Sequence, residues 1–412
     1  MLFSIAWKNV WRNKLRSLII IMAIAVGLFG GLFYLGFSNG MAQHQINSGI
    51  KTFISNLQIH NPKYLINNDT KYDIASPGKV IKKIKSIKHV KAVTSRIKAS
   101  AMISSAATGT GVMINGIDIG KEKEVTDLYS KIIDGDYFAT HLRNPILIGQ
   151  KLAEKLKVKV KSKVVITIQD MTGNITYGAF KVVGIFNTEN TNFDLGNVYV
   201  IKNGLSNLIG LNKKKVSEIA VLLDHNDFTK QVSKELKHIF TSEISSGNLT
   251  IRSWDQIDPI LRMLNNMTIQ FSMIFVVIIL VALSFGIINT MLMAIMERVR
   301  EIGMLMAIGM NRLKIFLMIM LETVFLSITG GIIGLAVSWV AIAITNKTGI
   351  DLSVVAKGLN SLGYSSFVHP ELGMMYYLLI GLLVILTAIV ASIFPARKAL
   401  KLNPAEAVRQ DV

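Results

Sequence analysis

Four long apolar segments divide this chain. They cover about residues 18–37, 271–296, 315–345 and 374–394, and each reaches the roughly 20 residues that a helix needs to cross a bilayer. Between about residues 41 and 270 no such segment occurs, and short patterns with the period of a strand or a helix take its place. The pattern predicts a membrane protein with four helical spans and one large hydrophilic domain between the first two.

The hydrophilic segment mixes strand and helix patterns. A first β-α-β-β order at 57–60, 77–89, 90–99 and 112–119 indicates a small α/β lobe. A stretch richer in strands follows at about 120–208, and the mixed pattern then returns. We therefore expect a large α/β external domain made of two lobes, with a β-rich lobe inserted into a mixed α/β lobe.

Basic residues gather beside the ends of the spans. They are Lys8, Arg12, Lys14 and Arg16 before the first span, Arg298, Arg300, Arg312 and Lys314 between the second and third, and Arg397, Lys398, Lys401 and Arg409 after the fourth. By the positive-inside rule both termini are cytoplasmic and the large domain is extracytoplasmic. This distribution, despite a formal net charge of +19, argues against a nucleic-acid partner.

The predicted order of segments follows from these patterns. It comprises a cytoplasmic interfacial helix at 1–17, spans at 18–40, 269–296, 315–345 and 373–395, an extracytoplasmic domain at 41–268, a cytoplasmic helix at 297–314, a short external loop at 346–372 and a cytoplasmic tail at 396–412. The first span is expected to stay uncleaved, because its apolar core is longer than that of a signal peptide and no A-x-A site follows it. The absence of cysteine excludes a disulfide framework.

A charged amphipathic segment follows the second span directly. Four charged residues fall within five positions: Glu297, Arg298, Arg300 and Glu301. Val299, Ile302 and Met306 form an apolar stripe at helical spacing. Such a helix either offers a docking site to a cytoplasmic partner or anchors the span through arginines at the headgroups. Spacing alone does not separate these two interpretations.

The third span contains an intramembrane charge and a glycine cluster. Because a charge within the bilayer is costly, Glu322 either faces a partner or water, or the helix starts in the interface and Glu322 reaches back to Arg312 or Lys314. Three glycines provide a face of small residues for close helix packing, within the chain or across a dimer: Gly330, Gly331 and Gly334.

No motif indicates catalysis. The chain lacks G-x-x-x-x-G-K-[ST], H-E-x-x-H and G-x-S-x-G, and its seven histidines are scattered without metal-ligand spacing. We therefore expect no enzyme activity, no metal and no cofactor of its own.

Several segments resemble the FtsX/MacB/LolE-type permeases of ATP-binding-cassette (ABC) transporters. They are W-K-N-V-W-R-N-K-L-R-S at 7–17, I-G-Q-K-L-A at 148–153, K-V-V-G-I-F at 181–186, E-R-V-R-E-I-G-M-L-M-A-I-G at 297–309 and P-A-R-K-A-L-x-x-x-P-A-E-A-V-R at 395–409. The resemblance covers nearly the whole chain, and the 297–309 motif is its most specific part. One departure is Lys161-Ser162, where the family usually turns through Gly-Asp.

The resemblance implies a division of labour. Such permeases pair as homodimers or heterodimers, and a separate cytoplasmic ATPase binds ATP and moves their external domains by mechanotransmission. The helix at 297–309 is then the ATPase docking site rather than an anchor. The coupling residues carried over from the motif are Glu297, Arg298, Arg300, Glu301, Ile302, Gly303, Leu305 and Gly309.

The resemblance also limits the candidate functions. A large external domain without a fused ATPase favours release of lipoproteins from the inner membrane, with a lipoprotein or other amphipathic substrate and a periplasmic chaperone as partners beside the membrane lipids. MacB-like efflux of drugs or peptides is the alternative within the family, and the division-linked branch, with its smaller external domain, fits less well. A non-transporting scaffold that activates an external enzyme is an alternative of another class.

Overall fold

The structure is a computed structural model that describes residues 2–74, 76–138, 143–188, 190–212, 215–361 and 364–400. The chain forms two compact units. A helical unit comprises Met1–Ala42, Asn265–Asp351 and Phe367–Val412, and a large domain comprises Gln43–Leu264 and Leu352–Ser366. The tail predicted at 396–412 lies outside the described residues from 401 onward.

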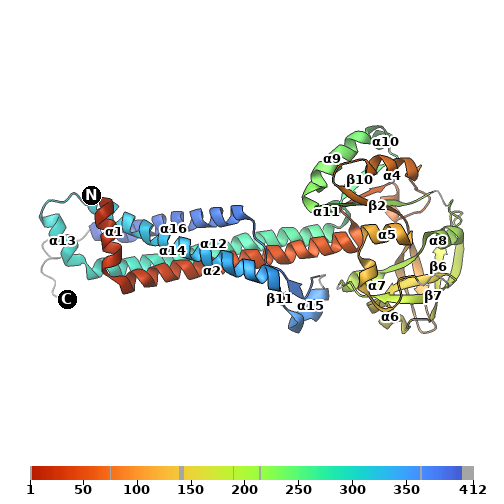
Figure 1. The fold of residues 1–412 in the computed structure, drawn as a ribbon, viewed down its shortest axis with the longest axis horizontal. Coiled ribbons are helices and arrows are strands. Elements are labelled where there is room, and N and C mark those ends of the chain that lie inside the picture. Colours follow the sequence, from red (N-terminus) through yellow and green to blue (C-terminus); the bar gives the residue numbers. More distant parts are fainter. Residues whose placement is uncertain are drawn as a thin grey trace. The chain divides into compact units, whose positions relative to one another are not determined.

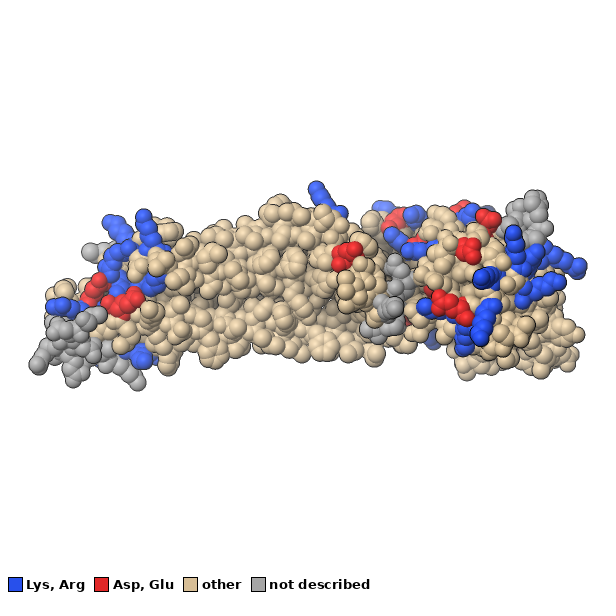
Figure 2. All heavy atoms as spheres, turned by 90° about the horizontal axis from the view of Figure 1, so that it is seen from below, with Lys and Arg blue, Asp and Glu red and all other residues tan. Residues whose placement is uncertain are grey.

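Four helices in the described residues are long and apolar enough to cross a membrane (Figure 1). They are α2 Lys14–Gly49 with its π-helical continuation η1 Ile50–Ile54, α12 Pro259–Glu297, α14 Arg312–Thr348 and α16 Met374–Leu400. Helix α2 with η1 and helix α12 extend well beyond the predicted spans at 18–40 and 269–296, whereas α14 exceeds the predicted 315–345 by three residues at each end. On the face drawn in Figure 2, the middle of the helical unit carries no charged side chain.

Two short helices flank the long ones. Helix α1, Leu2–Arg12, packs on α14 through Phe3 and Trp7, whose rings meet the ring of Phe325 edge to face at 6.2 and 5.4 Å between centroids. Helix α13, Val299–Ala307, occupies only the middle of the segment predicted as a helix at 297–314. Gly309 adopts φ +92° and Asn311 then caps α14, so the segment ends in a turn.

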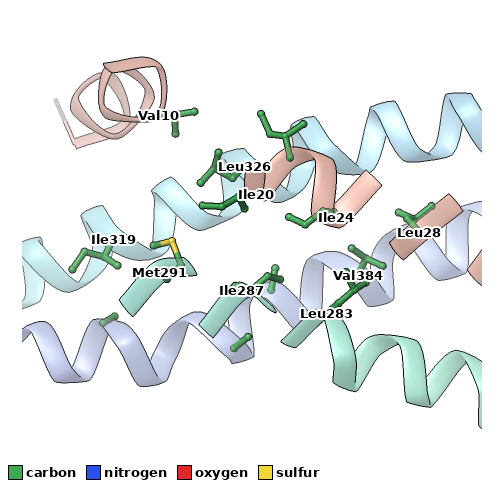
Figure 3. Close-up of a cluster of buried hydrophobic side chains, with 14 of the residues drawn as sticks. Val10, Ile20, Ile24, Leu28, Leu283, Ile287, Met291, Ile319, Leu326 and Val384 are labelled. Atoms are coloured by element: carbon green, nitrogen blue, oxygen red, sulfur yellow. The ribbon is translucent and has the colours of Figure 1, made fainter. Parts of the chain in front are cut away.

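The long helices share one apolar core (Figure 3). The buried side chains in that view come from every long helix and from α1: Val10, Ile20, Ile24, Leu28, Leu283, Ile287, Met291, Ile319, Leu326 and Val384. Helix α14 is the most enclosed, with half of its most apolar window buried, against 22% for α12. Helix α14 therefore organises the bundle, and α12 exposes most of its surface.

Glycines of α14 bring its backbone against α2. A Cβ added at Gly330 would lie 2.9 Å from the carbonyl oxygen of Ile21, and one added at Gly334 would lie 2.9 Å from that of Ala25. Gly331, expected on the same face, would meet no heavy atom within 4 Å. The close helix contact thus uses the pair at i and i+4, which shares one side of a helix.

The connection predicted as a short loop at 346–372 contains secondary structure. Strand β11, Ile350–Asp351, pairs antiparallel with β12, Phe367–Val368. Between them lie η4 Ser353–Val355 and α15 Ala356–Ser361, and Leu352–Ser366 belongs to the large domain rather than to the helical unit.

The large domain is built on a mixed sheet of ten strands. In chain order they are β1 Leu57–His60, β2 Val90–Ser104, β3 Gly109–Ile117, β4 Ile132–Gly135, β5 Pro145–Gly149, β6 Lys163–Gln169, β7 Ile175–Phe186, β8 Asn197–Ile201, β9 Glu218–Leu223 and β10 Thr250–Ser253. The strands are ordered β10-β1-β9-β2-β3-β8-β5-β7-β4, and β6 pairs with β2 and β7. The β3–β8 and β5–β7 pairs are parallel, and the others are antiparallel.

Helices complete the large domain. They are α3 Tyr64–Asn67, α4 Pro77–Lys85, α5 Ile119–Val125, η2 Leu128–Lys131, α6 Gln150–Leu156, α7 Thr191–Gly196, α8 Lys202–Ile209, η3 Asn226–Phe228, α9 Thr229–Ile239, α10 Thr241–Ser245 and α11 Trp254–Ile257. At the departure from the family, Lys161 takes φ +74°, the left-handed conformation that glycine usually supplies. The turn therefore keeps a left-handed residue without glycine.

Two main apolar cores confirm the two lobes. One core lies among β1, β9, β10, α4 and α9, and the other lies among the second half of β2, β3, β5 to β8, α6 and α8. The predicted start of the β-rich lobe at about 120 is too late, because the first half of β2 pairs with β9 and its second half pairs with β3 and β6. One long strand thus belongs to both lobes, which the sequence pattern did not separate.

A buried arginine lies on β2 where the lobes meet. The guanidinium of Arg96 contacts the carboxylates of Glu122 and Glu218 at 2.7 Å each, and donates to the carbonyl of Phe53 in η1 at 3.2 Å. All three charged side chains are at most 3% exposed. Burial alone would raise the pKa of Glu218, but Lys98 and Arg96 lower it to about 2. These contacts tie the end of the first long helix to both lobes.

We predict that Gly330→Ala and Gly334→Ala each lower the unfolding free energy of the chain by about 1–3 kcal/mol, because the added methyl would press against backbone atoms. Thermal unfolding of the purified protein in detergent measures the loss. Gly331→Ala is the control, since it makes the same change on the same helix with open space around it. Equal destabilisation at all three positions would contradict the prediction.

Candidate functional site

The candidate site is the segment that joins the second and third long helices. Helix α12 ends at Glu297, Arg298 precedes the first residue of α13, and Gly303 is buried within α13. The predicted apolar stripe faces inward: Val299 and Ile302 are each 5% exposed, and Met306 packs against the apolar core. One face of α13 is thus fixed to the helical unit.

The opposite face of α13 is open. Arg300 is exposed, and Met304 and Ile308 expose 55% and 75% of their surfaces. No ion pair involves Arg300 among the residues that the structure describes. The segment therefore presents two large apolar side chains and one unpaired cation to whatever lies outside the helical unit.

Six charged residues form a linear chain of ion pairs beside this helix, which we call the charged cluster. Its members alternate in sign in the order Arg12, Glu301, Arg298, Glu322, Arg16, Glu297, and their nearest N–O distances are 2.6, 3.1, 3.2, 3.4 and 3.4 Å. The residues come from α1, α2, α12, α13, α14 and the turn before α13. The cluster is electrically neutral and joins five helices.

Burial increases toward the middle of the charged cluster. The side chains of Glu322, Arg16 and Arg298 are 6%, 13% and 14% exposed, whereas those of Arg12, Glu301 and Glu297 are 53%, 49% and 43% exposed. The outer pairs contribute little because water screens them. Removal of one inner arginine, in contrast, leaves the buried carboxylate of Glu322 with a single partner.

Glu301 is the outer carboxylate with the most hydrogen bonds. Partial burial would raise its pKa, but hydrogen bonds from Arg12 and Arg298 hold the pKa below its usual value. Glu301 is therefore ionised at neutral pH and keeps α13 tied to α1 through Arg12.

Of the two interpretations of Glu322, the one with a facing partner agrees with the structure, and the one with Arg312 or Lys314 is wrong. The carboxylate of Glu322 contacts Arg298 and Arg16 rather than Arg312 or Lys314. Arg312 begins the same helix ten residues earlier, which is about 15 Å along the axis. The partners come from other helices, so periodicity within the third span gave no signal for them.

A cavity of about 330 Å³ lies beside the charged cluster. Its lining is mainly apolar and comes from α1, α12, α13 and α14, and includes Ile5, Met291, Ile295, Ile302, Leu305 and Met318. Arg12, Arg298 and Glu322 also reach its wall. The space therefore lies between α13 and the helices α1, α12 and α14 that pack around it.

The remaining predicted site residues lie on α14 and in or after α13. Along the α2–α14 interface, the Arg16–Glu322 pair is followed by Gly330 beside Ile21 and then by Gly334 beside Ala25. Leu305 packs against the core, and Gly309 forms the left-handed turn after α13. Within the described residues, no group of three or more His, Cys, Asp or Glu side chains could hold a metal ion.

Four long apolar helices with a large two-lobed α/β domain between the first and second define a membrane protein with several spans. The sequence model of the MacB-like periplasmic core domain matches residues 17–239, and that of the FtsX-like permease C-terminal domain matches residues 273–404. The chain belongs to the FtsX-like permeases of ABC transporters that carry a MacB-like periplasmic core domain.

Three relatives show how widely the family extends. An uncharacterized ABC transporter permease of Methanocaldococcus jannaschii is 25% identical, over 99% of this chain and 97% of its own length. The lipoprotein-releasing system transmembrane protein LolC of Buchnera aphidicola is 22% identical, over 95% and 93%. The macrolide export ATP-binding/permease protein MacB of Psychrobacter arcticus is 27% identical, over 50% and 29%.

A solved extracellular domain also matches. It belongs to the noncanonic ABC-type transporter YknZ from Gram-positive bacteria and is 20% identical, with a TM-score of 0.34, covering 48% of this chain and 99% of that domain.

We expect Arg298→Gln and Glu322→Gln each to lower the unfolding free energy by about 3 kcal/mol, because each breaks a buried ion pair and leaves its partner in place. The double variant should lose clearly less than the sum of the two, since the pair is then removed as a unit. Thermal unfolding in detergent provides the measurement. Arg300→Gln, which removes an exposed arginine from the same segment, is the control for loss of positive charge. Strictly additive losses in the double variant would refute the coupling.

Proposed function

We propose that this chain is the membrane subunit of an ABC transporter and that a separate cytoplasmic ATPase docks on α13. The exposed Arg300 and Met304 of α13, together with the exposed Ile308 directly after it, support this proposal. The basic residues beside α1, α13 and the end of α16 favour a cytoplasmic position for this end of the helices. Members of the family work with a cytoplasmic ATPase, and no nucleotide-binding motif occurs in this sequence.

The charged cluster supports a route for the force. A movement of α13 acts on Glu301 and Arg298, and through them on Arg12 of α1 and Glu322 of α14. The buried contacts of Arg298 and Arg16 with Glu322 carry most of this coupling, because water screens the outer pairs. Helix α12 is continuous from Pro259 to Glu297, and η1 continues α2 to Ile54, where Arg96 holds the Phe53 carbonyl. This route is mechanotransmission from α13 toward the large domain.

The surface of α12 supports pairing with a second permease. Exposed apolar side chains recur at intervals of three or four residues: Ile260, Met263, Met267, Phe271, Ile274 and Ile278. The first three precede the apolar span, and a stripe of this spacing is typical of helices that pack side by side. We propose that α12 contacts its counterpart in a homodimer or heterodimer.

We further propose that the transporter releases lipoproteins from the inner membrane. The lipoprotein-releasing relative aligns over nearly its whole length, whereas the ATP-binding/permease protein of Psychrobacter is matched over 29% of its length. The alignment over nearly the whole length of the lipoprotein-releasing relative supports this role. Efflux of drugs or peptides is the second candidate, because the identity to that MacB protein is as high within the aligned half.

We expect Arg300→Glu combined with Met304→Ser to weaken binding of the ATPase by about thirtyfold, the loss typical of a central contact residue. Both side chains are exposed, so the fold of the helical unit should be unchanged. Copurification of the ATPase and its hydrolysis rate are the readouts. Met375→Ser, with 73% of the residue exposed at the start of α16, is the control. Wild-type ATPase binding by the double variant would overturn docking at α13.

Depletion of the chain should retain lipoproteins in the inner membrane, because no subunit would then extract them. Separation of inner and outer membranes, followed by quantification of a lipoprotein in each, tests this expectation. Complementation by the wild-type gene, but not by the Arg300→Glu, Met304→Ser variant, links the defect to ATPase coupling. Unchanged sorting together with increased sensitivity to exported drugs or peptides would favour efflux instead.

A further inference from the structure

A shallow pocket in the large domain lies where the chain enters α12. It has a volume of about 550 Å³ and is bounded by α9, α10, β10, α11 and the first turn of α12. All its lining residues belong to the large domain. The pocket is separate from the charged cluster and has no part in the mechanism proposed above.

Three cations converge on this pocket from different elements. They are Lys237 of α9, Arg252 of β10 and Arg262 of α12, and all three are exposed. Within the part of the chain that the structure describes, no acidic residue forms an ion pair with any of them. Asp255 is the one acidic residue in the lining, and it accepts a hydrogen bond from Ser253. The pocket therefore carries uncompensated positive charge.

The neutral groups of the pocket add hydrogen-bond donors. The hydroxyls of Ser245 and Thr250 line it, together with the side-chain amide of Gln256. The oxygen of that amide accepts from the Ser253 N–H, which leaves its NH₂ group as a donor. Guanidinium and ammonium groups surrounded by such donors suit an anion with several acceptor oxygens, above all a phosphate.

The position of Arg262 along α12 relates the pocket to the membrane surface. No charged residue occurs between Arg262 and Glu297, and α12 is helical throughout this interval. Arg262 is therefore the last charged residue before the uncharged interval, a position at which basic side chains commonly meet lipid headgroups.

We propose that the pocket formed by Lys237, Arg252 and Arg262 binds the phosphate headgroup of an anionic phospholipid in the leaflet on the side of the large domain. The bound headgroup places a negative charge among three cations that otherwise repel one another. It also fixes the first turn of α12 at the membrane surface. Basic clusters next to a span bind anionic headgroups in this way, and each Lys or Arg adds to the attraction.

The test titrates phosphatidylglycerol or phosphatidylcholine onto the full-length chain in detergent and counts bound lipids by native mass spectrometry. The wild-type protein should bind one phosphatidylglycerol about tenfold or more tightly than phosphatidylcholine. The triple variant Lys237→Gln, Arg252→Gln, Arg262→Gln should lose this preference. Arg262→Lys should keep it, because the charge remains.

The control removes the same charge elsewhere. Lys79, Lys82 and Lys85 lie exposed on α4, and none forms an ion pair among the described residues. Their triple glutamine variant should bind phosphatidylglycerol as the wild type does. Equal losses in both triple variants would reduce the effect to net charge and overturn the pocket. Displacement by millimolar inorganic phosphate would show that a free anion suffices and would overturn the lipid assignment. Arg252→Gln alone, expected to weaken binding several-fold, tests the pocket if the triple variant fails to fold.

Discussion

The carboxylate of Glu322 sets the main constraint on the helical unit. It is only 6% exposed within the third long helix, and a charge in that position is stable only with a partner of opposite sign. Arg298 and Arg16 supply that partner from two other helices. The helices cannot separate without exposing or isolating a charge, so their ends are held in one arrangement. The segment after the second span is fixed by this pairing as much as by the apolar contact of Ile302.

The large domain also contains a buried charge held between two charges of opposite sign, but here the central charge is positive. Arg96 is buried between Glu122 and Glu218, and it also binds a backbone carbonyl of η1. Apolar packing alone would tolerate small slips between these elements, because it is not directional. Buried ion pairs lose most of their energy in such slips. In both units the directional contacts therefore lie where elements distant in the sequence meet.

The long helices have two roles: α2 and α14 pack closely, whereas α12 exposes much of its surface. Gly330 and Gly334 let α14 approach α2 along the line that begins at the Arg16–Glu322 pair, so these two helices form the fixed part of the bundle. Helix α12 is the least enclosed of the four and presents an apolar stripe. It is therefore the helix with the most surface available to lipid or to another protein.

The sequence by itself determined the number and approximate positions of the long helices, because a span must be apolar over the thickness of a bilayer. It also indicated the two lobes of the large domain, since strand and helix periods differ, and gave β1 its observed bounds. The helical spacing of its apolar residues also showed the 297–309 motif to be a charged amphipathic segment.

Only the tertiary structure decided which side chains meet. Glu322 pairs with Arg16, 306 residues away, because α2 and α14 are neighbours, and hydropathy carries no record of which helices adjoin. The same holds for Gly331, which the sequence groups with Gly330 and Gly334 but at which an added Cβ would meet no heavy atom within 4 Å. The division of β2 between two lobes and the burial of Arg96 depend equally on partners elsewhere in the chain. Local pattern fixes elements, whereas the pairing of charges and small residues is a property of the assembled fold.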